Sequence, residues 1–198
     1  TAADLVTWQR SLVSRALLDE RSSRSFMTPT TLSDGSSTNF GYAIQMAWFH
    51  EYENHAYTGW GEGFRARLSY FPLADVTIVV LANCDAAPVE RIERDIARFV
   101  LSIPLPPSEE MALAPEDAAR CAGLYQIATT QYRVVQKDGQ LWFTPPVDDP
   151  TRLCHRGNLT FVLESDRDVR LTFQVVDGRA ESFTIWRNGF ESKARRME

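Results

Sequence analysis

The sequence predicts an α+β fold: an antiparallel β-meander flanked by helices, followed by a small antiparallel β-barrel. Residues 64–70 and 76–82 have the alternating and the continuously apolar patterns of strands. Prolines cluster over residues 104–115, and short strand patterns then recur at regular spacing from residue 116 onward. We therefore expect a first domain over residues 1–103, a Pro-rich linker over 104–115 and a barrel module over 116–198.

Two helices are predicted beside the meander. The first has apolar residues at helical spacing, and Asp4 is placed to cap it. Polar residues 19–25 and 33–38 then predict loops, and residues 41–50 predict a further strand. The second helix spans residues 88–101 and begins at a proline, which the first turn tolerates. Its expected buried stripe consists of Val89, Ile92, Ile96 and Phe99.

The barrel is predicted from five strand patterns and two turn signals. Asp138-Gly139 and Asp177-Gly178 are typical of hairpin turns that need positive φ at both central residues. The strand patterns cover residues 132–136, 141–144, 159–164, 169–176 and 182–187, and they indicate roughly eight strands in all. The strand aromatics are Tyr125, Tyr132, Trp142, Phe161, Phe173, Phe183 and Trp186. They either fill the barrel core or line a ligand cavity, and a core is the more usual role in a small barrel.

Composition excludes several classes of function. The net charge is −5 and only two lysines occur, Lys137 and Lys193, so the clustered cations of a nucleic-acid-binding protein are missing. No apolar run reaches 18 residues, which indicates a soluble protein, either periplasmic or cytoplasmic. The three cysteines are too few and too far apart for a disulfide framework, and the three histidines do not complete metal-ligand spacing with them. We expect no metal and no cofactor.

An ordered set of motifs lies between residues 57 and 101. Tyr57-Thr58-Gly59-Trp60 precedes Gly63-Phe64, and two strands later the chain has Leu81-Ala82-Asn83 and a helix. Over residues 4–101 this order resembles the C-terminal third of the serine β-lactamase and D-alanyl-D-alanine peptidase superfamily, closest to class C and CubicO-type enzymes. Residues 116–198 resemble, more weakly, the lipocalin-like module often appended to such hydrolases.

The resemblance implies roles for five residues. The backbone N–H of Trp60 would donate to the oxyanion, as one half of an oxyanion hole. Thr58 would hydrogen-bond the substrate, and Gly59 would let it approach the backbone. Tyr57 takes the position of the family's Lys or His, but it carries no positive charge at neutral pH. His55 shares a strand face with Tyr57, so it either replaces that missing side chain or is a surface or loop histidine.

The family's nucleophile motif, Ser-x-x-Lys, does not occur in this sequence. The residues three before the two lysines are Val134 and Phe190. Tyr52-Glu53-Asn54 matches the family's Tyr-x-Asn, but it lies too close to Tyr57, so we interpret it as chance. Ser36 and Ser37 are interpreted as loop serines.

Two functions follow as hypotheses. The chain is the C-terminal part of a serine hydrolase of esterase, D-amino-acid peptidase or β-lactamase type, inactive alone and acting on a small ester or amide. Alternatively, it is a non-enzymatic binding or oligomerisation protein with a vestigial site. Under either hypothesis we expect it to form a homo-oligomer or to bind an N-terminal fragment of the same protein, because the strand at residues 76–82 would leave an edge unpaired.

Overall fold

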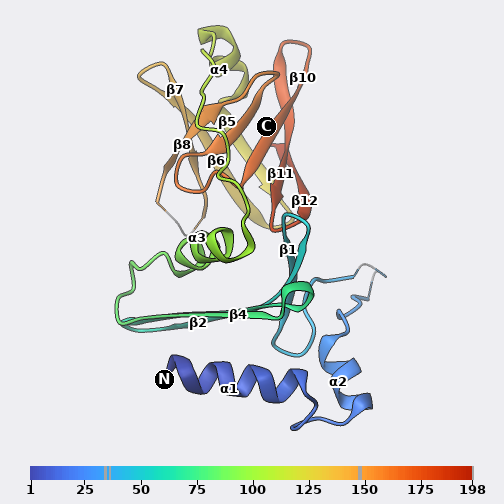
Figure 1. Cartoon of the computed structure of the whole chain (residues 1–198). Coiled ribbons are helices and arrows are strands. Elements are labelled where there is room, and N and C mark those ends of the chain that lie inside the picture. Colours follow the sequence, from blue (N-terminus) through green and yellow to red (C-terminus); the bar gives the residue numbers. More distant parts are fainter. Residues whose placement is uncertain (34, 36, 147–148, 198) are drawn as a thin grey trace. The chain divides into compact units, whose positions relative to one another are not determined.

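The computed structural model describes residues 1–33, 35, 37–146 and 149–197, and it divides into two compact units. Unit 1 is Thr1–Leu105 and unit 2 is Pro106–Glu198. The predicted α+β fold is confirmed: unit 1 holds a four-stranded antiparallel sheet with helices, and unit 2 holds an eight-stranded antiparallel barrel (Figure 1). No helix in the described ranges is long and apolar enough to cross a membrane. Ser36 lies outside the described residues.

The sheet of unit 1 is a meander in which each strand pairs with the next along the chain. Its strands are β1 (Gln45–Phe49), β2 (Tyr52–Gly61), β3 (Phe64–Phe71) and β4 (Val76–Ala82), and the short 3₁₀ turn η1 (Pro72–Ala74) joins β3 to β4. Helix α1 (Ala2–Val13) lies along one face and α3 (Val89–Leu101) along the other (Figure 1). The sheet is therefore covered on both faces.

Local capping explains the two N-terminal helices. The N-cap of α1 is Thr1 rather than Asp4, and Asp4 completes a capping box with it. A second helix, α2 (Glu20–Met27), occupies the stretch that the sequence predicts as a loop, so that prediction is wrong. Asp19 caps this helix by accepting the Ser22 N–H at 2.7 Å. Because α2 has no buried residue, it leaves no apolar periodicity in the sequence.

Helix α3 is oriented differently from the prediction. Val89 is buried as expected, but Ile92 and Ile96 are about two-fifths exposed and Phe99 is 87% exposed. The face toward the sheet instead carries charged residues, including Glu93 at 1% exposure. The buried-stripe prediction is therefore wrong for three of its four residues. The outer face of α3 is an apolar surface with no partner among the described residues of unit 1.

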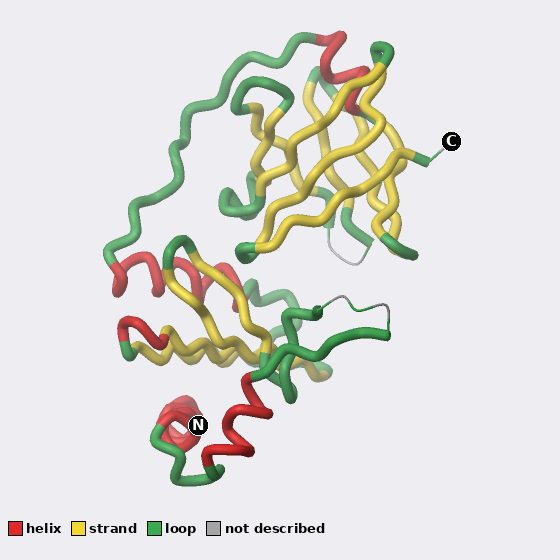
Figure 2. Tube along the Cα trace, turned by 90° about the vertical axis from the view of Figure 1, so that its right-hand side faces the viewer, coloured by secondary structure: helices red, strands yellow, loops and turns green. Residues whose placement is uncertain are grey.

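Eight strands of unit 2 close into a barrel (Figure 2). Its helix is α4 (Pro115–Cys121), and its strands are β5 (Gly123–Ile127), β6 (Thr130–Lys137), β7 (Gln140–Thr144), β8 (Thr151–His155), β9 (Thr160–Leu163), β10 (Arg170–Val176), β11 (Arg179–Arg187) and β12 (Phe190–Arg196). Asp138-Gly139 and Asp177-Gly178 have positive φ at both residues, as predicted. Asn188-Gly189 forms a third turn of this kind.

Aromatic side chains fill the barrel core. Tyr125, Phe143, Phe161, Phe173 and Phe183 are at most 5% exposed and contact one another. The core role is thus confirmed for most of the predicted aromatics, whereas Trp142 and Trp186 are half-buried and lie outside this cluster. The rings occupy the interior of the barrel, as is usual for eight strands.

Arg196 ties the end of the last strand to the start of the first one. Its guanidinium donates to the carbonyls of Arg120, Ala122 and Ala180 and stacks on the Tyr125 ring at 4.9 Å. A Cβ added to Gly123 would lie 2.0 Å from this guanidinium. A side chain at position 123 would therefore displace this guanidinium near the place where β5 meets β12.

Candidate functional site

The predicted site lies on β2, at a strand edge that β1 leaves unpaired. β1 pairs with β2 only as far as Ala56, opposite Gln45. The Met46 N–H donates to Asn39 and so points away from β2, which makes Gln45 and Ala56 a hydrogen-bonded pair. By alternation, the N–H groups of Thr58 and Trp60 point to the same side as that of Ala56. Among the described residues, no strand pairs with this edge beyond Ala56.

The hairpin that carries this edge is fixed at its tip. Gly63 has a φ of +79°, which suits glycine, and its N–H donates to Asp85 Oδ1 at 2.9 Å. Arg65 Nε donates to the Asp85 carbonyl at 3.0 Å. Trp60 and Phe64 remain 68% and 64% exposed at the tip. Asp85 lies two residues after Leu81-Ala82-Asn83. The chain just beyond that motif therefore anchors the β2–β3 hairpin, which carries Tyr57-Thr58-Gly59-Trp60.

Thr58 lies above a buried ion pair. On the neighbouring strand, Arg67 stands opposite Thr58 and donates from Nη1 to Thr58 Oγ1 at 2.7 Å. Arg67 Nε lies 3.6 Å from Glu93 Oε2 on α3, and the two side chains are 6% and 1% exposed. Burial raises the pKa of the Glu93 carboxyl, and Arg67 opposes that shift. Because the Thr58 oxygen already accepts from Arg67, its own O–H is left to donate elsewhere.

Tyr57 and His55 lie on the opposite sheet face from Thr58. The Tyr57 ring contacts Trp8 of α1 edge-on, at 5.3 Å between centroids. Burial raises the pKa of Tyr57 to about 12, so the hydroxyl is neutral at physiological pH, and it has no hydrogen-bond partner among the described residues. His55 is 7% exposed in β2, with Nε2 2.9 Å from Glu53 Oε1. The alternative of a surface or loop histidine is therefore wrong.

A cavity of about 360 Å³ adjoins His55 and Tyr57, between the sheet and the two N-terminal helices. Gly59 lies on the same strand face, and a Cβ there would come 3.3 Å from the Ala66 Cβ. The sheet thus separates the five predicted residues into two groups. His55, Tyr57 and Gly59 face α1, whereas the Thr58 and Trp60 side chains face the α3 side.

Among the residues that the structure describes, groups for nucleophilic catalysis are not assembled at this edge. Lys137 and Lys193 both belong to unit 2, where Lys193 Nζ contacts Gln174 Oε1 at 3.0 Å. Asn54 of the Tyr52-Glu53-Asn54 sequence is 4% exposed inside the sheet. In the described part of the chain, no group of three or more His, Cys, Asp or Glu could hold a metal ion. The edge offers backbone N–H and C=O groups, together with the Thr58 hydroxyl.

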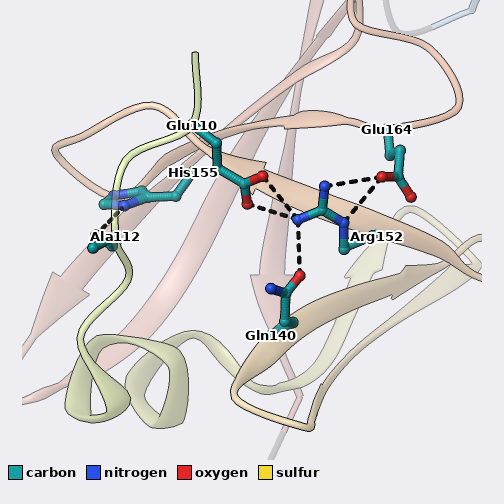
Figure 3. Close-up of polar contacts among 6 residues, drawn as sticks. All are labelled: Glu110, Ala112, Gln140, Arg152, His155 and Glu164. Carbon is teal, nitrogen blue, oxygen red and sulfur yellow. Dashed lines mark hydrogen bonds and ion pairs between the residues drawn. The ribbon is translucent and has the colours of Figure 1, made fainter. Parts of the chain in front are cut away.

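Unit 2 has a polar cluster that sequence reasoning missed. Arg152 on β8 donates to Glu110 at 2.7 Å, to Glu164 at 2.9 Å and to Gln140 at 2.8 Å (Figure 3). His155 Nδ1 lies 3.0 Å from the Ala112 carbonyl. These contacts hold part of the stretch interpreted as a linker against β8, so we assign the cluster a structural role.

No protein-family model matches this chain, and no curated protein matches it. Among solved structures, it is similar to SurE, with 20% identity and a TM-score of 0.48 over 100% of this chain and 48% of that chain. It is also similar to SurE with D-Leu, with 20% identity and a TM-score of 0.46 over 100% of this chain and 50% of that chain. It is also similar to an octameric penicillin-binding protein homologue from Pyrococcus abyssi, with 14% identity and a TM-score of 0.48 over 97% of this chain and 46% of that chain. The chain spans about half the length of these proteins.

Proposed function

We propose that this chain is the C-terminal part of a serine hydrolase of the β-lactamase-like type and that it supplies the third active-site motif. The observation that carries the proposal is the open edge of β2, where the Trp60 N–H points away from β3. An N–H fixed by a strand and free of an internal partner is the donor that a developing oxyanion needs. The nucleophilic serine and its own N–H come from polypeptide outside this chain.

Thr58 supports this role, because its O–H is directed by Arg67 rather than left to rotate. The hydroxyl accepts from a buried guanidinium and can donate toward the open edge. Tyr57 supplies no positive charge, so attraction for a carboxylate next to the reacting bond is weak. Neutral esters and amides are therefore the favoured substrates.

Two surfaces support association with further polypeptide. β4 is the last strand of its sheet, so one of its edges has no strand partner among the described residues. The outer face of α3 exposes Ile92, Ile96 and Phe99. A second copy of this chain or an N-terminal fragment of the same protein would cover them.

The same surfaces favour a second candidate, a non-enzymatic binding or oligomerisation protein. In that case the motif is vestigial, as the loss of a cation at Tyr57 would allow. Purified chain should match buffer with a chromogenic cephalosporin and with nitrophenyl esters under both hypotheses. Turnover by the chain alone that a serine-directed phosphonate blocks would contradict both.

Co-expression with the missing polypeptide distinguishes the hydrolase hypothesis from the binding-protein hypothesis. The sequence encoded upstream of Thr1, or in an adjacent gene, should contain Ser-x-x-Lys followed by Tyr-x-Asn. We expect that polypeptide and this chain to form a complex that hydrolyses esters and whose serine reacts with the phosphonate. A complex without turnover, or a coding region without these motifs, favours the binding protein and contradicts the hydrolase.

A further inference from the structure

The cavity beside Tyr57 has apolar walls and an open, charged rim. Its volume is about 360 Å³, within the size range of small-molecule sites. The apolar lining residues include Leu12, Val13, Leu18, Met27, Ile44 and Pro72. The floor is deeply buried, since Ile44 is 1% and Tyr70 8% exposed. Such a space suits an aliphatic or aromatic group of several carbon atoms.

The rim carries an unpaired cation. Arg15, Glu20 and Arg24 all line the cavity and are exposed. Arg24 is paired with Glu20 at 3.0 Å. The Arg15 guanidinium, in contrast, has no hydrogen-bond or ion-pair partner among the described residues. The rim therefore has a net charge of +1 on a chain whose net charge is −5. A cation beside an apolar cavity is complementary to an apolar ligand that ends in an anion.

The floor of the cavity continues into the candidate site. His55 and Tyr57 line the cavity, and the next residues of the same strand, Thr58 to Trp60, form the open edge. A ligand whose reacting bond lies along that edge could therefore place a neighbouring group in the cavity.

We propose that this cavity is a specificity pocket for an apolar group bearing a carboxylate, with the apolar part between α1, α2 and the sheet and the carboxylate at Arg15. Only its role in selecting a substrate rests on the proposed function. The carboxylate lies at the rim and not next to the reacting bond, so the preference for a neutral ester or amide at the edge is retained.

The chain alone provides the test. Hexanoate, hexanamide and acetate are titrated against it by calorimetry, while the methyl signals of Leu12 and Ile44 are followed by NMR. We expect hexanoate to bind with a Kd of about 0.1–1 mM and to shift both methyl signals. Hexanamide should bind about three- to fivefold more weakly, because it loses an exposed ion pair. Acetate, which has no apolar part, should not bind at these concentrations.

Three variants locate the site. Arg15→Gln should weaken the binding of hexanoate to the level of hexanamide binding, and it should leave the affinity for hexanamide unchanged. Arg10→Gln is the matched control, because Arg10 is an exposed arginine of α1, five residues before Arg15, and it does not line the cavity. Leu12→Trp should fill the space and abolish binding of both ligands, with an unchanged circular dichroism spectrum.

Equal affinity for hexanoate and acetate, equal effects of Arg15→Gln and Arg10→Gln, or binding that survives Leu12→Trp would each overturn the proposal. These measurements involve no turnover. Failure of the hydrolase proposal appears instead as an inactive co-expressed complex, so the two outcomes are separate.

Discussion

Substituting Glu93 tests the buried ion pair that supports Thr58. Glu93→Gln removes the carboxylate and leaves Arg67, which is 6% exposed, without its nearest counter-charge. Losing one partner of a buried pair costs about 3–5 kcal/mol. We expect the lower limit, about 3 kcal/mol, because the two atoms are 3.6 Å apart and Glu90 also attracts Arg67.

Urea unfolding measures this change, with hydrogen exchange at residues 64–71 reporting on unit 1 alone. With a urea dependence of about 1–2 kcal/mol per molar, the midpoint should fall by about 2 M. Asp95→Asn is the matched control on the same helix. It removes one partner of the exposed pair Arg91–Asp95, at 4.0 Å, and should cost less than about 0.5 kcal/mol.

A pair replacement distinguishes lost charge pairing from lost packing. Arg67→Met combined with Glu93→Leu removes both charges and keeps most of the volume, so it should recover most of the stability lost in Glu93→Gln. If Glu93→Gln costs no more than Asp95→Asn, the pair is not a buried electrostatic contact and the reasoning is refuted.

Three further predictions concern other parts of the chain. Gly123→Ala should displace the Arg196 guanidinium from its carbonyls and lower the stability of the barrel by about 2 kcal/mol, measured by urea unfolding; unchanged stability would show that Arg196 moves freely. Cys84, which is exposed, should react with a thiol reagent in the native state, whereas Cys121, whose pKa burial raises to about 12, should react only after unfolding. Spectrophotometric titration should show a tyrosine that ionises near pH 12 and is absent in Tyr57→Phe. Because the pKa of Tyr57 is higher in the folded chain than in the unfolded chain, the contribution of Tyr57 to the stability of the fold should be lost as the pH rises from about 10 to 12.

The sequence predicts those elements whose local chemistry and final environment agree. Asp138-Gly139 and Asp177-Gly178 form their turns because only a few residue types tolerate positive φ at both positions. The strands of the meander are also predicted from their patterns, although their burial does not follow those patterns. β3 is buried on both faces from Arg67 to Phe71, and in β4 only Ile78 is buried. Strands β5, β8 and β12 are missed because they are short, polar or partly charged, and barrel closure rather than their own pattern makes them strands.

The orientation of α3 shows where sequence reasoning fails. A periodic apolar stripe is assigned to the interior on the assumption that the chain buries its own apolar surface. Here Ile92, Ile96 and Phe99 face outward while Glu93 faces the sheet, because Arg67 provides a buried counter-charge. The same limit holds for the site. Spacing places His55 and Tyr57 on one face, but it gives no sign of Arg67 below Thr58 or of the cavity formed with α1 and α2.

The central claim is that the Trp60 N–H is a catalytic donor, and a comparison of two substitutions isolates the loss of that group. In the complex with the serine-bearing polypeptide, Trp60→Pro deletes an N–H that points to an open edge, where proline breaks no ladder hydrogen bond. Trp60→Ala is the control, since it removes the side chain and keeps the N–H. We predict that Trp60→Pro lowers kcat for ester hydrolysis by about 10²–10³-fold while the complex still forms, and that Trp60→Ala changes it by less than about tenfold. Equal kcat values for the two variants in intact complexes would contradict the account.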